Sequence, residues 1–123
     1  CSGLGTLRRN PDLKWRQDLK AVEEMALKQT AILESAARLL KSGGRLVYAT
    51  CSVMPQENEA IAQAFSAAHP DFRALPVGEV LSQLKVSEAA SLCSGGDAGQ
   101  LYLRLWPHRH ATDGFFAAIW ERN

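Results

Sequence analysis

The fold is decided by the stretch Arg45-Leu-Val-Tyr-Ala-Thr-Cys-Ser52, which is followed by Pro55-Gln-Glu-Asn-Glu59. Gly43-Gly44 ends a helix before this apolar run, and Pro55 suits the first turn of a second helix because its φ is fixed. Cys51 is therefore predicted at a strand-to-helix turn. Ligands of open α/β sheets bind beyond the carboxyl ends of the strands, and a nearby helix N-terminus favours a thiolate. Cys51 is a candidate nucleophile, although most free cysteines are small buried hydrophobes.

Composition limits the class of protein. A chain of 123 residues, 46% of them hydrophobic, predicts one domain. A net charge of +1 does not decide the partner but leaves room for a local basic patch. The 3 cysteines form no C-x-x-C pair, so they fit neither a disulfide framework nor a zinc site and favour a reducing cytoplasm. No apolar run spans a membrane. Because the chain begins at Cys1, we expect a piece of something longer.

Hydrophobic periodicity predicts an α/β order of elements. An amphipathic helix is expected first, with Gln29 as the one break in its apolar stripe, and then a buried central strand. The second helix carries Glu57 and Glu59 in its first turn, where they suit its dipole. The final two strands are joined by a short turn and should be antiparallel. The expected helices are 18–41, 55–68 and a short one near 80–84, and the expected strands are 45–50, 72–77, 101–106 and 115–120.

Other candidate residues lie in loops. Residues 1–11 form a glycine-containing loop, and Arg8, Arg9, Lys14 and Arg16 surround Trp15, a mixture that can hold a nucleic-acid backbone and stack a base. A solvated face is the commoner explanation of such a cluster. The histidines of the 107–114 turn lack a third metal ligand, so a surface turn and no metal are expected there. Cys93 is interpreted as an incidental thiol.

Three motifs occur in register with those of a known family. They are Cys1-Ser-Gly-Leu-Gly-Thr-Leu-Arg-Arg-Asn-Pro11, Leu46-Val-Tyr-Ala-Thr-Cys-Ser52 with Glu57-Asn-Glu59, and Pro107 through Asp113-Gly-Phe-Phe-Ala117. Together they resemble the RNA (cytosine-5) methyltransferases of the Sun/RsmB (Fmu) family. The resemblance implies the C-terminal half of a Rossmann-like, S-adenosylmethionine-dependent methyltransferase sheet that ends in an antiparallel strand pair. Residues 1–123 are then the C-terminal portion of one catalytic domain, without its cofactor-binding N-terminal half.

The resemblance also implies roles for individual residues. Cys51 matches the cysteine of the family's Thr-Cys-Ser motif and is the implied nucleophile toward cytosine C6. Cys1 matches the cysteine of the Asp-Ala-Pro-Cys motif and is implied in product release. Arg8 and Arg9 are the candidate RNA contacts. The implied substrate is RNA, ribosomal rather than transfer RNA, and the implied cofactor is S-adenosylmethionine, bound mostly by residues upstream of Cys1.

Departures from the family pattern leave alternatives open. The Asp-Ala-Pro that precedes the cysteine, the glycine-rich cofactor turn and the acidic ribose-binding residue are missing. We therefore expect the 123-residue chain to be inactive alone, and to self-associate through an exposed sheet edge. One alternative is a non-catalytic RNA-binding or ribosome-assembly module. Another is a DNA cytosine-5 methyltransferase with Cys1 as nucleophile, against which the Thr-Cys-Ser sequence argues.

Overall fold

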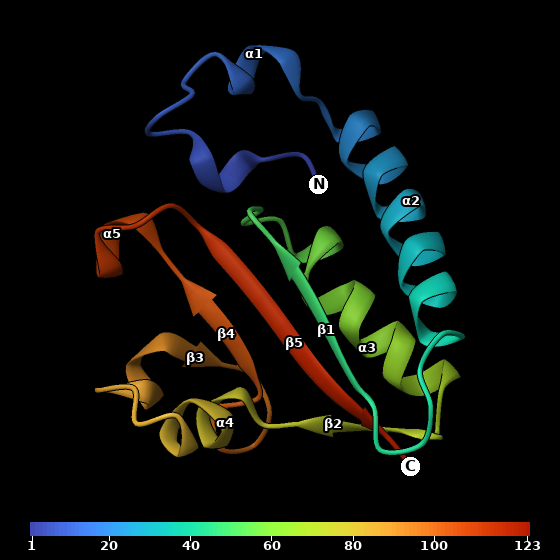
Figure 1. The fold of residues 1–123 in the computed structure, drawn as a ribbon. Coiled ribbons are helices and arrows are strands. Elements are labelled where there is room, and N and C mark those ends of the chain that lie inside the picture. The colour runs from blue at the N-terminus through green and yellow to red at the C-terminus, as the bar shows by residue number, and fades with distance from the viewer.

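A long C-terminal strand, β5 (Phe115–Arg122), lies at the centre of the sheet in the computed structural model, which describes residues 1–123 (Figure 1). Strand β1 (Arg45–Thr50) pairs antiparallel with one edge of β5. Strands β4 (Tyr102–Leu105) and β2 (Phe72–Leu75) pair antiparallel with β5 as well, at its two ends. The short β3 (Cys93–Ser94) extends the sheet beyond β4. The predicted antiparallel terminal pair is thus confirmed as β4 and β5.

Helices α2 (Leu19–Ala37) and α3 (Glu59–Ala68) lie beside β1 and cover one face of the sheet (Figure 1). Between them and the sheet lies a core of twelve buried side chains, whose aromatic members include Phe65, Phe116 and Trp120. The remaining elements are short: η1 (Leu4–Thr6), α1 (Leu13–Arg16), η2 (Pro55–Glu57), α4 (Val77–Gln83), η3 (Ala89–Leu92) and α5 (Pro107–His110).

Most predicted elements are present with adjusted ends. The first helix begins where expected, with Asp18 accepting a hydrogen bond from the backbone N–H of Ala21 at 2.7 Å. It ends at Ala37, four residues earlier than predicted, and Leu39 beyond it is 84% exposed. No packing on the sheet therefore holds a further turn in place. Pro55 opens a 3₁₀ turn before α3, and the expected short helix is α4.

The prediction of a fully buried β1 is wrong. Strand β1 was expected to be central and fully buried, but its side chains alternate between exposed and buried, and Val47 is 56% exposed. The physical reason is that α2 and α3 cover only one face of the sheet, so the β1 side chains that point to the other face remain exposed (Figure 1). The alternating sequence of residues 101–106 predicts a strand with one face buried, and β4 has such a face, formed by Tyr102 and Arg104, while the leucines between them are only partly covered.

None of the helices combines the length and the apolar character needed to cross a membrane.

Candidate active site

Two thiols meet at the carboxyl end of β1. Cys51 follows Thr50, the last residue of the strand, and its Sγ lies 3.3 Å from the Sγ of Cys1. Both cysteines are free; Cys1 is exposed and Cys51 is partly covered. The predicted strand-to-helix position of Cys51 is confirmed. The structure therefore brings the two sequence-predicted cysteines, fifty positions apart in the chain, into direct contact.

The N-terminal segment reaches Cys51 because Gly5 packs against two backbones. The Gly5 N–H donates to the carbonyl of Cys51 at 2.8 Å, and the Gly114 N–H donates to the carbonyl of Gly5 at 2.7 Å. A Cβ at Gly5 would lie 2.3 Å from the Gly114 oxygen and 2.6 Å from the Cys51 oxygen. Only glycine fits between them. The three motifs of the sequence thus converge on one site.

A buried carboxylate lies behind the thiols. Glu57, at the end of η2, is 0% exposed. Its Oε1 accepts from the backbone N–H of Ser2 at 2.6 Å, and its Oε2 accepts from the Ser2 hydroxyl at 2.6 Å and from the Ser52 hydroxyl. Gln29 of α2 donates to Oε1 at 3.4 Å. Serines next to both cysteines are therefore bound to one side chain.

The turn that follows β1 is fixed by further buried hydrogen bonds. Thr50 donates to the Asn58 side-chain oxygen at 2.5 Å, and the Asn58 amide donates to the Ser52 carbonyl at 2.9 Å. The Tyr48 hydroxyl donates to the Glu57 carbonyl oxygen. Burial, and then the charge of Glu57, raises the pKa of Tyr48 well above its ordinary value. These hydrogen bonds fix the backbone conformation of the turn that contains Cys51.

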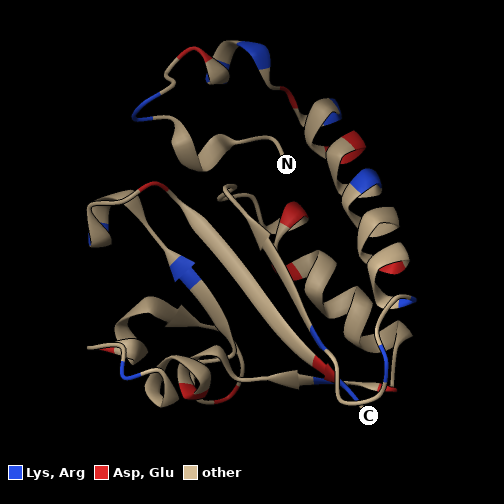
Figure 2. Ribbon diagram, viewed as in Figure 1, with Lys and Arg blue, Asp and Glu red and all other residues tan.

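The predicted basic residues lie at the edge of the site. Arg8 is exposed and makes no ion pair, whereas Arg9 pairs with Asp113, its Nε lying 3.2 Å from Oδ1. The Arg9 side chain is nevertheless 70% exposed. Figure 2 shows the Lys and Arg positions of residues 8–16 gathered around the N-terminal loop and α1. Trp15 in this segment is 81% exposed.

The other candidate residues have structural partners. The Trp106 N–H donates to Nδ1 of His110 at 2.9 Å, and Nε2 of His110 lies 2.8 Å from the Ser91 carbonyl, so this histidine ties α5 to η3. No group of three or more His, Cys, Asp or Glu side chains is placed to hold a metal ion. Cys93 donates to the Ala89 carbonyl, and burial raises the pKa of its thiol.

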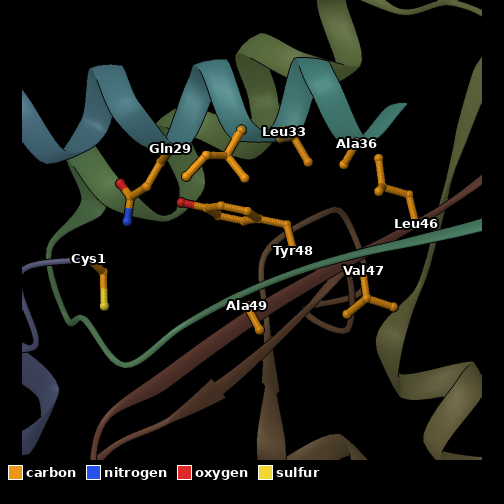
Figure 3. A pocket seen from close by; sticks show the side chains of 9 residues that line it. Cys1, Gln29, Leu33, Ala36, Leu46, Val47, Tyr48 and Ala49 are labelled. Carbon is orange, nitrogen blue, oxygen red and sulfur yellow. The ribbon is translucent and has the colours of Figure 1, made fainter. Parts of the chain in front are cut away.

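An apolar groove of about 310 Å³ runs along the open edge of β1. Figure 3 shows Cys1 facing β1, the Tyr48 ring lying beneath α2 near Leu33, and Val47 on the other side of the strand. The Gln29 Oε1 at this groove is buried and has no hydrogen-bond donor. The groove contains no acidic residue.

Comparison with known proteins identifies the family. A family model described as 16S rRNA methyltransferase RsmB/F matches residues 1–121. The chain belongs to this family. It is 44% identical over 118 residues to the probable ribosomal RNA small subunit methyltransferase B of Synechocystis, covering 96% of this chain and 24% of that protein. It is 40% identical to ribosomal RNA small subunit methyltransferase B of Sodalis glossinidius, covering 96% of this chain and 23% of that protein.

Solved structures of similar proteins have the same fold. The crystal structure of PH0851 superposes with a TM-score of 0.82 at 40% identity, over 99% of this chain and 25% of that one. NSun6 from Pyrococcus horikoshii, solved with SFG, gives a TM-score of 0.73 at 28% identity, over 99% of this chain and 28% of that one. The expected fold class, part of a Rossmann-like methyltransferase sheet with an antiparallel strand pair at its end, is therefore confirmed. The chain spans about a quarter of the length of the curated relatives it matches.

Sequence reasoning missed the polar residues that support the thiols. Glu57 was assigned to the helix dipole, yet its carboxylate is buried against Ser2 and Ser52. Glu59 was assigned in the same way, but it forms an ion pair with Arg104 at 2.8 Å. The available signal was Gln29, since a polar residue within an apolar helical stripe indicates a buried polar partner.

Proposed function

We propose that the complete gene product methylates C5 of cytosine in RNA, with ribosomal RNA as substrate and S-adenosylmethionine as methyl donor. The observation that carries the proposal is the contact between Cys1 and Cys51 at the carboxyl end of β1 in an RsmB/F family chain. The names of the relatives support ribosomal RNA as the substrate. Residues 1–123 are proposed to be the C-terminal portion of the catalytic domain.

Cys51 is proposed to be the nucleophile. Cytosine C5 attacks a methyl donor poorly, so the thiolate first adds to C6, forming an S–C6 bond and shifting electron density to C5. The residue's position at the end of a strand, partly covered but not enclosed, suits attack on a base that is single-stranded or flipped out of its stack.

Cys1 is assigned to the release step. Once C5 carries the methyl group, the C5 proton must leave and the S–C6 bond must break. The C5–H electron pair then re-forms the C5–C6 double bond, and the S–C6 electron pair returns to the sulfur of Cys51. A second thiol 3.3 Å from the first is close enough to take part in this step. Arg8 and Arg9 are proposed to hold RNA phosphate beside the site.

The cofactor is proposed to bind outside the described residues. Ribose hydroxyls need a carboxylate partner and the nucleotide needs a glycine-rich turn, but the groove beside Cys1 is apolar and Gly5 is occupied by backbone packing. When bound, S-adenosylmethionine supplies the methyl group that C5 receives. The structure of NSun6 was solved with SFG, an analogue of S-adenosylmethionine, which supports S-adenosylmethionine as the methyl donor.

We infer that the part of the protein preceding Cys1 covers the open edge of β1. That edge offers unpaired backbone groups, the groove beside it is apolar, and Gln29 Oε1 lacks a donor that a neighbouring backbone N–H would supply. Without this cover, the chain is proposed to self-associate along the same edge. Two free thiols in contact support a reducing cytoplasm as the compartment.

Methyl transfer by cysteine variants of the complete gene product tests the proposal. With labelled S-adenosylmethionine and small-subunit ribosomal RNA, Cys51→Ala should lower turnover by about 10³-fold or more, because covalent activation is lost. Cys1→Ala should form the protein–RNA adduct but release it slowly. Cys93→Ala is the matched control and should turn over normally. Reversed roles for Cys1 and Cys51 would indicate the DNA-methyltransferase type of chemistry, and full activity of all three variants would indicate a non-catalytic module.

A further inference from the structure

We propose that Glu57 is a positioning residue that holds the two cysteine-bearing segments together and thereby sets the separation of the two thiols. The inference deepens the proposed function and rests on it for its catalytic consequence. Its structural part depends only on the contacts around Glu57.

Glu57 binds the immediate neighbour of each cysteine. Ser2 donates twice, from its backbone N–H and from its hydroxyl, both at 2.6 Å, and Ser52 donates its hydroxyl to the same carboxylate. The two hydroxyls also lie 3.4 Å from each other. Because Cα atoms of adjacent residues are about 3.8 Å apart, fixing the serines restricts the cysteines as well.

The burial of Glu57 makes this link stiff. The carboxylate is 0% exposed, receives four donors and has no basic partner among the ion pairs of the structure. A carboxylate only accepts hydrogen bonds, so it matches a shell made of donors. Removing it leaves the buried donors of Ser2 and Ser52 without this acceptor, and the two segments are then joined only by the Ser2–Ser52 hydroxyl contact, the Gly5 hydrogen bond to the Cys51 carbonyl and the thiol contact itself.

Other contacts do not provide the same link. Gly5 binds the Cys51 carbonyl, which fixes the backbone of the N-terminal segment three residues beyond Ser2. Gln17 donates to the Ser2 carbonyl at 3.1 Å but has no contact with the Cys51 turn. Glu57 is thus the one side chain whose carboxylate contacts both serines.

Glu59 supplies a matched control. It is two residues away, its carboxylate is also largely covered, and it pairs with Arg104 without touching either cysteine segment. Glu57→Gln and Glu59→Gln make the same change in size and charge. Glu57→Gln alters the contacts with the two serines, whereas Glu59→Gln removes the charge opposite the buried Arg104. A fall in thiol pairing in Glu57→Gln alone therefore reports on the serine contacts and not on the loss of a buried charge.

The test is the effective concentration of the two thiols, measured in the complete gene product by equilibrium with reduced and oxidised glutathione. The Cys51 thiolate attacks oxidised glutathione and releases one glutathione thiolate; the Cys1 thiolate then attacks the Cys51 sulfur and releases the second. Two protein thiols are oxidised and one glutathione disulfide is reduced to two thiols. Peptide mass spectrometry quantifies the Cys1–Cys51 linkage, and thermal unfolding confirms that each variant folds.

We expect Glu57→Gln to lower this effective concentration at least tenfold and Glu59→Gln to leave it within twofold of the unmodified protein. An unchanged value in Glu57→Gln, or an equal fall in both variants, overturns the proposal. If Glu57→Gln does not fold, Ser52→Ala decides: a fall supports the link and an unchanged value overturns it. Because the equilibrium involves neither RNA nor a methyl donor, it holds or fails independently of the proposed function.

The catalytic consequence has a separate readout. In methyl transfer, Glu57→Gln should resemble Cys1→Ala, with a lower kcat, a KM for RNA within twofold and a persistent protein–RNA adduct. A kcat that falls without adduct accumulation contradicts the positioning of Cys1. Absence of any adduct in every variant, including the unmodified protein, contradicts the proposed function instead.

Discussion

The carboxyl end of β1 and the open edge of the same strand are built in opposite ways. At the carboxyl end, polar side chains from four segments are buried and hydrogen-bonded, and two thiols are held in contact. Along the open edge, Val47 and Ile32 of α2 are 56% and 68% exposed, and the groove between strand and helix is apolar. The chain thus has a closely hydrogen-bonded thiol pair beside an uncovered apolar surface.

The carboxyl end of β1 is the proposed site of the chemistry, whereas its open edge is a surface for packing. Every hydrogen bond that holds Cys51 and Cys1 comes from residues of this chain, so the geometry of the thiols is specified locally. The apolar groove and the open edge of β1 are not covered by any other element of this chain. We therefore expect changes at the carboxyl end to affect chemistry and changes at the open edge to affect association.

The largest expected effect is loss of all methyl transfer when residues 1–123 are assayed alone. The thiols are present, but the cofactor is proposed to bind mostly upstream of Cys1, and the open edge of β1 lacks its proposed cover. Incorporation of labelled methyl into RNA, compared with the complete gene product at equal concentration, measures this. Transfer by residues 1–123 alone would contradict this expectation, because the carboxyl end of β1 would then be active without a cover on the open edge.

Gly5→Ala should destabilise the carboxyl end next most strongly. The added methyl group meets the Gly114 and Cys51 carbonyl oxygens, and such overpacking costs about 1–3 kcal/mol of unfolding free energy. Urea denaturation measures the loss. Gly43→Ala, at a residue with φ of +80° and no neighbour within 4 Å, should cost only about 1 kcal/mol and leave the thiols in contact. Equal disruption of the thiol pair by both variants would contradict the role of Gly5.

Val47→Lys tests whether the open edge of β1 mediates association. A charge on the open edge of β1 should prevent strand pairing between copies, while stability changes by less than about 0.5 kcal/mol because the side chain is largely exposed. Sedimentation of residues 1–123 over a range of concentrations should show association for the unmodified chain and a monomer for the variant. Association that persists in Val47→Lys, or its loss in Cys1→Ser, would place the contact elsewhere.

Tyr48→Phe should have a small effect on stability that depends on pH. Because burial raises the pKa of Tyr48, the unfolded chain loses this proton near pH 10 while the folded chain retains it. The stability is fully present below about pH 10 and declines as the pH rises toward the folded pKa. Tyr102 has a pKa raised by burial and then by Glu59, so some slope remains in the variant.

Thermal unfolding between pH 8 and pH 11 tests this prediction. The unmodified chain should lose stability more steeply above about pH 10 than Tyr48→Phe does. At neutral pH the variant should be less stable by about 1 kcal/mol, since the hydroxyl donates to the Glu57 carbonyl. Identical alkaline slopes would show that Tyr48 is not held protonated in the folded chain.

Local sequence patterns predicted the elements that flank the site. Gly43 and Pro55 bracket β1 as expected, because turn residues and helix starts depend on nearby residues only. The contact between Cys1 and Cys51 was not predictable from spacing, since it depends on Gly5 and Gly114 packing together across more than a hundred residues. The family resemblance implied the roles of Cys1 and Cys51, and the structure shows that their sulfur atoms lie 3.3 Å apart.

The burial of individual residues was the least predictable property. The apolar run of β1 predicts two covered faces, but coverage depends on which strands and helices are present, and Val47, opposite Ile119 of β5, is still 56% exposed. Glu57 and Glu59 look alike in sequence at the start of a helix. Tertiary packing alone places Glu57 against Ser2 and Ser52, and Glu59 against Arg104.

The most direct test of the account is to map the covalent RNA adduct in the complete gene product carrying Cys1→Ala. Nuclease and protease digestion followed by mass spectrometry identifies the modified thiol. We expect a methylated cytosine attached to Cys51, and no attachment to Cys93, which lies in the separate β3. A nucleotide on Cys93, or no adduct while methyl transfer continues, would contradict Cys51 as the nucleophile.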